Sequence, residues 1–495
     1  MENLLRISPA DNVAVALKNL SKGDRAEIDK NAFALVCDVP FGHKVALADI
    51  PAGGDVVKYA HRIGRAKTDI PRGGKVDETN LKTALGGLDE YEYRPAVPAP
   101  QPPQSAFFNG YARASGEVGV RNELWVMPLV SCVNCLARSA VEKFARPLSE
   151  NFDGAFAICH SYGCSQLGCD HANTRAILAD LCMNPNAGGV LVLSLGCENN
   201  KLSEFKAELE NRGADFSRIR FLEAQKSDDE IADALAILEE LAEIMSGDRR
   251  VKTPLSKLKI GLKCGGSDAF SGITANALIG KFSDRAVACG ASCALCEVPE
   301  MFGAESLLMN RAESAEVFEK FVAMINDFKN YFISNKMPVY ENPSPGNKAG
   351  GISTLEEKSL GCVQKGGTSA VRDVLRYAQR ISKTGLTLLE SPGNDPVAAT
   401  ALAAAGCQIV LFSTGRGTPF ATAVPTIKIS SNTPLFEKKN NWIDFNAGSV
   451  LDGKNLDELG GEFFDFVLSV ANGTKTKAEL NGYKEIAIFK TGVTL

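Results

Sequence analysis

The 495-residue chain lacks the features that most simply assign a protein to membranes or nucleic acids. No apolar run reaches the roughly eighteen residues needed to cross a bilayer. Residues 1 to 20 contain no basic segment followed by an apolar core. Lysine-rich or arginine-rich runs are also missing, and the formal net charge of -5 offers no basic field for a phosphate backbone. We therefore expect a cytoplasmic enzyme with a small-molecule substrate, no nucleic-acid partner and no association with membranes.

The length and the cysteine content set two further limits. A chain of 495 residues exceeds what one hydrophobic core supports, so we expect roughly two to four domains. Fourteen cysteines suit a reducing compartment, where thiols act as small buried hydrophobes or soft metal ligands rather than as disulfides.

The first 88 residues predict a small module built of strands. Short β-like runs alternate there with Gly and Pro, and the turn DIPAGGDVV (49–57) is echoed by DIPRGGKVD (69–77). The Pro-rich segment YRPAVPAPQPPQS (93–105) follows, and its prolines favour an extended conformation. We interpret residues 89–106 as a linker.

Beyond the linker, the sequence repeats a pattern of strand, glycine-bearing loop and helix. Such short and nearly continuous apolar runs are typical of parallel strands covered on both faces. The runs are DGAFAIC (153–159), GGVLVLSLG (188–196), KLKIGLK (257–263), GLTLLE (385–390) and CQIVLFS (407–413). A capping box of Ser227 and Glu230 predicts the start of a helix that extends to about residue 244. The fold class is therefore α/β, with one region at 107–250 and a second at 257–495, separated by a boundary within 246–256.

Polar loops follow all five predicted strands. In open α/β sheets ligands bind beyond the carboxyl ends of the strands, so we expect these loops to meet at one sheet edge as a composite active site. The loops are HSYGCSQLGCDHANTR (160–175), CENN (197–200), CGGSDAFSG (264–272), SPGNDP (391–396) and TGRGTPF (414–420).

Individual residues of these loops allow a catalytic and a structural interpretation. In the catalytic interpretation, His160 and Cys164 act as a base or as soft ligands of a metal ion. In the structural interpretation, His160 caps a strand and the Cys164 thiol packs in the interior. Ser267 and Asp268 are polar contacts for an anion, or the cap of a following helix. Cations able to pair with a substrate carboxylate are Lys348, next to Asn347 in ENPSPGNKAGG (341–351), and Arg416.

The stretch ACGASCALCE (288–297) has the CxxxCxxC spacing of cluster-binding radical enzymes, at Cys289, Cys293 and Cys296. A cluster needs a loop that wraps three sulfurs round one point, whereas this run reads as an extended strand. We expect buried thiols there. CVNC (132–135) lacks the second half that a zinc or redox motif requires.

Long ordered stretches of the chain resemble the altronate and galactarate dehydratase family over nearly the whole length. The stretches include GHKVALADI (42–50), GEVGVRNELWVMP (116–128), HSYGCSQLG (160–168), SLGCENN (194–200), GLKCGGSDAFSGITAN (261–276), EVPEMFGAE (297–305), ENPSPGNKAGG (341–351), LFSTGRGTP (411–419) and AIFKTGVTL (487–495). The resemblance implies that residues 1–88 form a β-clip domain of the antifreeze-like type. It also implies a homo-oligomeric hydro-lyase of hexuronate catabolism that converts D-altronate to 2-keto-3-deoxy-D-gluconate and water.

The resemblance further implies a divalent metal, Fe²⁺ with Mn²⁺ as the alternative, and no nicotinamide, flavin or pyridoxal. Residues in matching motifs receive hypothetical roles. We expect proton transfer by His160, with Tyr162, Lys348 and Asp268 also catalytic, and substrate contacts from Ser267, Asn347 and Arg416. Metal ligands are expected among His43, Asp77, Glu78, Cys164, Cys197 and Cys264. An iron–sulfur centre is the alternative to a single ion, with Cys132, Cys164, Cys197 and Cys264 as its candidate ligands.

The sequence departs from the family pattern at two places. Asp77 and Thr79 stand where the altronate branch usually has histidines, so the carboxylates of Asp77 or Glu78, together with His43, would make a harder metal site, or the module would bind no metal. Cys169 stands where the family usually has Asp. The rival functions are a galactarate or other sugar-acid dehydratase, which the acidic Asp77 and Glu78 favour, and a non-catalytic sugar-acid-binding protein.

Overall fold

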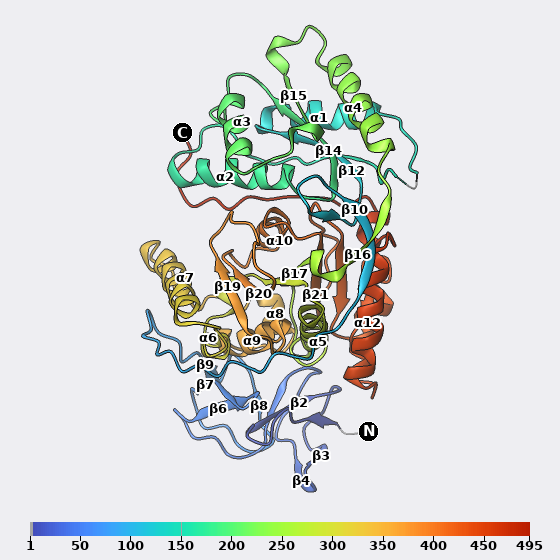
Figure 1. The fold of residues 1–495 in the computed structure, drawn as a ribbon. Helices are drawn as coiled ribbons and strands as arrows, with labels where there is room; N and C mark the ends of the chain where they lie inside the picture. Colours follow the sequence, from blue (N-terminus) through green and yellow to red (C-terminus); the bar gives the residue numbers. More distant parts are fainter. Residues whose placement is uncertain (1–2, 150) are drawn as a thin grey trace.

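A computed structural model describes residues 3–149 and 151–495. The chain forms three regions, with an N-terminal β module at one end, a seven-stranded sheet in the middle and a four-stranded sheet at the other end (Figure 1). This agrees with the α/β fold class and the N-terminal strand-built module expected from the sequence.

The N-terminal module consists of three small antiparallel sheets. Their strands are β1 (Leu4–Leu5), β2 (Val13–Ala16), β3 (Arg25–Ile28), β4 (Asn31–Ala34), β5 (Lys44–Ala46), β6 (Asp55–Lys58), β7 (His61–Ala66), β8 (Lys75–Val76) and β9 (Leu81–Lys82). The two echoed turns are partners, because Ile50 and Ile70 each donate a backbone hydrogen bond of 2.8 Å to the other. Gly53 and Gly73 occupy equivalent positions with φ of 80° and 81°, a conformation that glycine adopts without strain.

The linker has no regular secondary structure between residues 83 and 106. It nevertheless lies along the C-terminal region, since the Tyr93 hydroxyl donates to the Ala312 carbonyl at 2.9 Å. The Ala96 amide likewise donates to Asn310 and the Gln104 amide to Ala288. Its proline-rich backbone is therefore anchored at several points.

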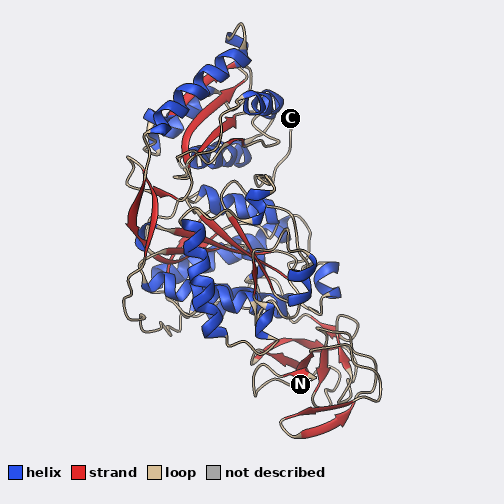
Figure 2. Cartoon of the chain, turned by 90° about the vertical axis from the view of Figure 1, so that its right-hand side faces the viewer, coloured by secondary structure: helices blue, strands red, loops and turns tan. Residues whose placement is uncertain are grey.

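The four-stranded sheet is parallel and has the order β13-β12-β14-β15. Its elements are β12 (Glu123–Pro128), β13 (Ala155–Ala157), β14 (Ala187–Ser194), β15 (Ile219–Glu223), α1 (Asn134–Lys143), α2 (Gly168–Cys182), α3 (Leu202–Asn211) and α4 (Glu230–Ser246). Helices lie on both faces in Figure 2, and alternate residues of β12 face them. Leu124 and Val126 pack with α1 and α4, whereas Trp125 and Met127 pack with α2 and α3.

The seven-stranded sheet is also parallel, in the order β19-β20-β18-β17-β21-β22-β23. Its strands are β17 (Lys259–Cys264), β18 (Ser292–Leu295), β19 (Val371–Leu375), β20 (Gly385–Leu389), β21 (Ile409–Thr414), β22 (Thr426–Ser430) and β23 (Phe445–Asn446). Its helices are α5 (Ala275–Ala288), α6 (Glu305–Met309), α7 (Ala315–Ser334), α8 (Pro345–Ala349), α9 (Leu355–Cys362), α10 (Asp395–Ala404), α11 (Thr433–Lys438), α12 (Leu456–Ala471) and α13 (Lys477–Leu480). The chain order reverses between β17 and β21, which makes the gap between their carboxyl ends the topological switch point. None of the helices in the described part of the chain has the length and apolarity of a bilayer crossing.

The two sheets are joined at the amino ends of their strands. Gln408, just before β21, accepts from the Asn186 side chain on its backbone carbonyl at 2.9 Å, and Asn186 lies just before β14. The Gln408 side chain donates to the carbonyls of Val118 and Lys257, both at 2.9 Å. The segment expected as a boundary also contributes, because it contains β16 (Arg250–Pro254), which pairs with β10 (Phe107–Ala112) beside β11 (Val118–Gly119).

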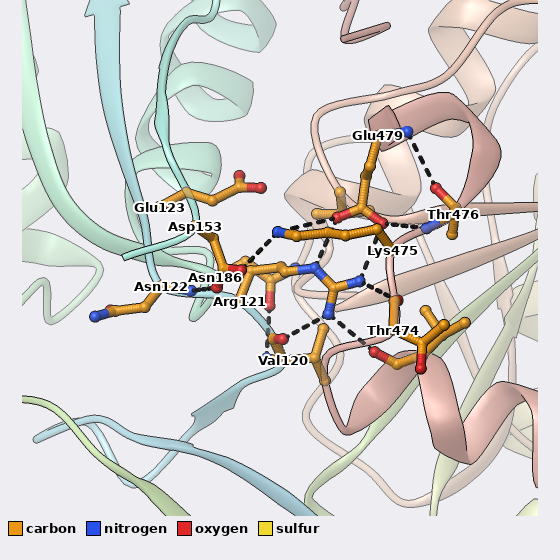
Figure 3. A network of polar contacts seen from close by, with 12 residues as sticks. Val120, Arg121, Asn122, Glu123, Asp153, Asn186, Thr474, Lys475, Thr476 and Glu479 are labelled. Carbon is orange, nitrogen blue, oxygen red and sulfur yellow. Dashed lines mark hydrogen bonds and ion pairs between the residues drawn. The ribbon is translucent and has the colours of Figure 1, made fainter. Parts of the chain in front are cut away.

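A buried arginine provides a second connection near the start of β12 (Figure 3). The Arg121 guanidinium donates to both carboxylate oxygens of Glu479 at 2.7 and 3.0 Å, and to the carbonyls of Val470 and Thr474. Although burial opposes ionisation, the arginine holds the pKa of Glu479 down at about 2. This bidentate pair fixes the end of the C-terminal region to the four-stranded sheet.

Two local predictions have different outcomes. The capping box at Ser227 is wrong, because α4 begins at Glu230 with Asp229 as its cap, and the Asp229 carboxylate accepts from the Ala232 amide at 3.0 Å. Asp229, two positions after Ser227, accepts from the free backbone amides of the first helical turn, and the Ser227 hydroxyl donates to the Asp233 carboxylate instead. The strand within ACGASCALCE is confirmed as β18 (Ser292–Leu295), and Cys293 and Cys296 are buried as expected, whereas Cys289, at the end of α5, is half-buried.

Candidate functional site

The switch point between β17 and β21 carries the loop that follows Cys264. A Cβ atom on Gly265 would lie 2.6 Å from the Asp395 carboxylate and from the Phe412 ring, so any other residue here would force those side chains to shift. Gly266 has a φ of 64°, also typical of glycine. The loop therefore turns sharply over the strand ends, which is the position expected for a ligand site in an open parallel sheet.

Asp268 joins neighbouring loops at this edge. One carboxylate oxygen accepts from the Ser271 amide at 2.9 Å and the Ser271 hydroxyl at 2.8 Å. The other accepts from the Ser431 hydroxyl at 2.8 Å and the Asn432 side chain at 3.0 Å. Since both oxygens are occupied, Asp268 holds the loops together and is not a free acid or base, and it is not the cap of the following helix either, because the N-cap of α5 is Thr274.

Ser267 and Asn347 are neighbours. The Asn347 side-chain amide donates to the Ser267 carbonyl at 2.8 Å, and Asn347 also completes the capping box of Ser344 at the start of α8. The Ser267 hydroxyl is 2% exposed and has no hydrogen-bond partner in the described part of the chain. A buried hydroxyl without a partner is free to bind a polar ligand atom.

Lys348 lies on the short helix α8, where the glycine-rich sequence predicted a loop, and Arg416 lies on the loop after β21; both segments approach Asp268. Cβ atoms placed on Gly350 and Gly415 would lie 3.1 and 2.3 Å from the side chain of Asp268, so the backbone of both segments approaches Asp268 closely. Lys348 is half-buried and Arg416 is exposed, and within the described residues neither side chain forms a hydrogen bond or ion pair. Two unpaired cations thus flank the switch point, where they can meet an anionic ligand.

A buried group of ionisable side chains lies beneath this loop. Cys264, Glu300 and Cys362 are the only His, Cys, Asp or Glu residues in the described chain whose ligand atoms group within 4.8 Å in a set of three. The Cys264 thiol donates to Glu300 at 2.9 Å, and its sulfur lies 3.4 Å from that of Cys362. Such a set has the donors that a divalent ion uses.

Lysines already occupy two of these three donors. The Lys365 ammonium lies 2.8 Å from the Cys264 sulfur, and the Lys358 ammonium lies 2.7 Å from Glu300. Despite burial, the charges of Lys358 and Lys365 hold the pKa of Glu300 well below its usual range. A divalent cation would meet both ammonium charges at contact distance, so the arrangement does not fit the metal that the resemblance implies.

The N-terminal module docks against this region through a buried charge triad. The Lys44 and Lys58 ammonium groups each lie 2.8 Å from the Glu357 carboxylate on α9, and all three side chains are at most 1% exposed. Lys44 also donates to the Gly351 carbonyl at 2.8 Å. The Phe41 ring packs on Phe270, with centroids 4.6 Å apart. The module therefore covers the loops of the seven-stranded sheet.

The carboxylate expected to bind a metal inside the module has other partners. Asp77 pairs with Lys75 at 2.7 Å and accepts from the Thr79 amide at 2.9 Å, so its carboxylate shapes a turn. His43 is half-buried, and burial together with Lys44 lowers its pKa. His43, Asp77 and Glu78 do not form a ligand group in the described chain.

His160 lies at the carboxyl edge of the other sheet, where it organises the backbone. Its Nε2 donates to the Pro128 carbonyl at 2.8 Å, and its Nδ1 accepts from the Tyr162 amide at 3.1 Å. Burial lowers the pKa of His160 to about 4, so the ring is neutral at neutral pH. Both ring nitrogens are bonded to backbone, and the geometry therefore supports a positioning role rather than the proton transfer expected from sequence.

Tyr162 and two of the expected cysteine ligands share this edge. Tyr162 is half-buried and packs in the same apolar cluster as Tyr377, which follows β19 of the larger sheet. Cys164 and Cys197 are exposed. Cys264 belongs to the larger sheet, so the expected thiol ligands are divided between two sheets.

The expectation that five polar loops meet at one sheet edge is thus wrong as stated. Three loops belong to the seven-stranded sheet and two to the four-stranded sheet. No hydrogen bond or ion pair among described residues joins His160 to Lys348 or Arg416. The arrangement is that of a multidomain α/β enzyme with polar loops at two adjoining carboxyl edges.

Comparison with known proteins gives the family. Residues 255–494 match the D-galactarate/altronate dehydratase C-terminal model, residues 110–246 match the D-galactarate dehydratase/altronate hydrolase second-domain model, and residues 2–84 match the altronate/galactarate dehydratase SAF-domain model. The altronate dehydratase of Bacillus subtilis is 51% identical and covers 100% of both chains, and that of Escherichia coli is 51% identical over 99% of each. The galactarate dehydratase (L-threo-forming) of Escherichia coli is 36% identical over 95% of this chain and 93% of its own. The chain belongs to the altronate/galactarate dehydratase family, whose members are sugar-acid hydro-lyases.

Sequence reasoning did not single out the buried charges. Lys44, Lys58 and Glu357 meet across about 300 residues of sequence, and no local pattern marks such a pairing. Glu300 lies within the family stretch EVPEMFGAE, which was the one available signal.

Proposed function

We propose that this protein is an altronate dehydratase, which converts D-altronate to 2-keto-3-deoxy-D-gluconate and water. The observation that carries the proposal is the greater likeness, over the full length, to two altronate dehydratases than to a galactarate dehydratase. The acidic Asp77 no longer favours the galactarate activity, because Lys75 and Thr79 account for its carboxylate. We further propose that the enzyme acts in the cytoplasm as a homo-oligomer.

The reaction removes a weakly acidic proton from C2, beside a carboxylate, and expels hydroxide from C3, and the proton and the hydroxide together leave as water. Negative charge therefore develops on the carboxylate as the proton leaves. Lys348 and Arg416, the unpaired cations at the switch point, bind that carboxylate and balance the charge. The Ser267 hydroxyl, which has no partner in the described chain, donates to a substrate hydroxyl. The enol product tautomerises to the ketone.

Two roles proposed from the sequence remain open to test. Tyr162 stays the candidate acid for the leaving hydroxide, because a half-buried phenol can donate a proton. The requirement for Fe²⁺ or Mn²⁺ also stays a proposal, without an assigned ligand set, because lysines occupy the donors of Cys264 and Glu300 and because His43, Asp77 and Glu78 do not group in the described chain.

Substrate preference tests the function directly. Anaerobic protein supplied with ferrous iron is incubated with altronate or with galactarate, and formation of the 2-keto-3-deoxy acid is measured. We expect a higher kcat/KM with altronate. A higher value with galactarate would assign the protein to the other branch of the family, and binding without product would remove the enzymatic assignment.

The carboxylate contacts are tested by single neutral substitutions. Arg416→Gln and Lys348→Gln should each raise KM for altronate by about tenfold or more, because each removes a charge-assisted hydrogen bond. Lys438→Gln is the matched control, since Lys438 is exposed at the end of α11 and has no ion pair in the described chain. An unchanged KM in both site variants would place the substrate elsewhere.

A further inference from the structure

The hairpin between β6 and β7 has a strained aromatic residue at its tip. Lys58 pairs with His61, so Tyr59 and Ala60 form a two-residue turn, and their φ angles are 60° and 61°. Such turns strongly prefer Asn-Gly, and a left-handed backbone is an outlier for a bulky side chain. Because backbone strain is concentrated at functional sites, we asked what the Tyr59 side chain reaches.

The turn directs Tyr59 out of the N-terminal module and into the C-terminal region. Strand β7 lies beside α9 (Figure 1). A Cβ atom placed on Gly272 would lie 2.5 Å from the Tyr59 hydroxyl oxygen, and one placed on Gly361 would lie 3.7 Å from it. Gly361 is inside α9, where glycine weakens a helix, so both positions leave room for the hydroxyl. Burial raises the pKa of the Tyr59 phenol, which therefore carries its proton at neutral pH.

Tyr59 lines a small polar cavity at the switch point of the seven-stranded sheet. The other walls of the cavity include Ser267, Asp268, Lys358 and Cys362. Its volume is about 10 Å³, which is room for one water molecule or one substrate hydroxyl. Within the described residues neither the Tyr59 hydroxyl nor the Ser267 hydroxyl has a hydrogen-bond partner. Two residues with unpaired hydroxyl groups therefore line a space that fits a single oxygen atom.

The cavity adjoins the two cations proposed to bind the substrate carboxylate. Asp268 lines it, and the segments that carry Lys348 and Arg416 both approach Asp268 closely. In an aldonate the C3 hydroxyl is only two carbons away from the carboxylate, so a substrate held by these cations brings that hydroxyl near the cavity. Tyr162, in contrast, belongs to the four-stranded sheet and packs in an apolar cluster.

We propose that Tyr59 of the N-terminal module is the acid that protonates the oxygen leaving C3, which enters this cavity beside Ser267. The inference rests on the proposed function and gives Tyr59 the role considered above for Tyr162. After the C2 proton has been removed, its electron pair forms the C2–C3 double bond, the C3–O bond breaks, and the oxygen takes the phenol proton and leaves as water. The proton removed from C2 returns to the Tyr59 phenolate through solvent, which closes the cycle.

Tyr59→Phe tests this role, because it removes the hydroxyl and keeps the ring that packs against the apolar core of the C-terminal region. The full-length variant is loaded anaerobically with ferrous iron and incubated with altronate in deuterium oxide. We expect kcat for the keto acid to fall by about 100-fold. Deuterium should still enter C2 of the recovered altronate, because removal of the C2 proton does not need the acid. Unchanged dehydration, or an equal loss of exchange at C2, would overturn the inference.

Three further variants separate chemistry from docking. Tyr93→Phe is the matched control, since it removes a linker hydroxyl that donates to the Ala312 carbonyl, and its kcat should equal that of the wild type. Ser267→Ala lies outside the module and should slow dehydration by about tenfold with exchange at C2 retained. Iron content and resistance of the linker to proteolysis should match the wild type in each variant. Loss of dehydration in Tyr162→Phe, with full activity in Tyr59→Phe, would give the role to Tyr162.

The result is separable from the test of the proposed function, because both substrates are used with every variant. Dehydration of altronate at the wild-type rate by Tyr59→Phe would overturn this inference and leave the function standing. A wild type that prefers galactarate, together with a Tyr59→Phe variant that loses galactarate dehydration but retains exchange beside the carboxylate, would support the role of Tyr59 and overturn the function. No product from either substrate would overturn both.

Discussion

Glu357 is the residue whose neutralisation should most weaken the docking of the N-terminal module. The change Glu357→Gln keeps the shape of the side chain but leaves the buried ammonium groups of Lys44 and Lys58 without their carboxylate, 2.8 Å from each. Removal of one partner from a buried ion pair typically costs about 3 to 5 kcal/mol.

The pKa of the carboxyl gives an independent magnitude. Burial alone would raise it, but Lys44 and Lys58 lower the pKa of Glu357 from 4.5 to about 2, which corresponds to about 3 kcal/mol at neutral pH. Burial and repulsion from Lys58 lower the pKa of Lys44, so Lys44 is the group expected to release a proton in the variant. That release limits the cost, and we expect a loss near about 3 kcal/mol.

The assay has two parts. Guanidinium titration measures the free energy of unfolding, and proteolytic cleavage within the linker detects release of the N-terminal module. Because the folded pKa of Glu357 is depressed, its contribution is complete above pH 4.5 and is lost as the pH falls toward about 2. In the triple variant Lys44→Met, Lys58→Met, Glu357→Leu, most of the stability should return, since no buried charge is left unpaired. A free energy of unfolding for Glu357→Gln within about 0.5 kcal/mol of the wild type would refute the reasoning.

Four further substitutions test other parts of the structure. Arg121→Lys should lower the free energy of unfolding by about 2 to 4 kcal/mol, because lysine cannot pair with both oxygens of Glu479, and calorimetry measures the loss. His160 has a folded pKa of about 4 against 6.5 unfolded, so wild-type stability should fall as the pH drops from 6.5 to 4 by about 3 kcal/mol. His160→Gln should remove that part of the pH dependence in denaturant titrations, and an unchanged slope would contradict it. Asp229→Ala should cost about 1 kcal/mol and Ser227→Ala less, since only Asp229 caps α4.

Much of the local fold could be predicted because its causes are local. The apolar run 188–196 became β14, since both faces of that strand are covered and no alternation is needed. The twin DIPxGG turns predicted the strand-built module for a similar reason. The assignment of strands to sheets could not be predicted, because the sequence of an apolar strand does not specify which strands it pairs with. The five polar loops were therefore expected at one sheet edge, whereas they lie at the edges of two sheets.

The candidate site was predictable in part. Lys348 and Arg416 could be predicted because cations stand out in glycine-rich segments of the sequence, and in the structure neither side chain has a partner among the described residues. The role of His160 could not be predicted from the sequence, because its ring is held by the backbone carbonyl of Pro128, which lies 32 residues earlier in the chain. A spacing pattern does not show which hydrogen bonds a side chain has already made.

Gln408 places the joint between the two sheets at the ends of the strands that are farthest from the polar loops. A rotation about that joint would leave the amino ends nearly still and would move the opposite ends most. Along the 8 residues of β14, roughly 26 Å at the usual rise, a tilt of about 5° displaces the loops by about 2 Å. The relative position of the two carboxyl edges would then depend on the hydrogen bonds of Gln408 at the opposite end of both sheets.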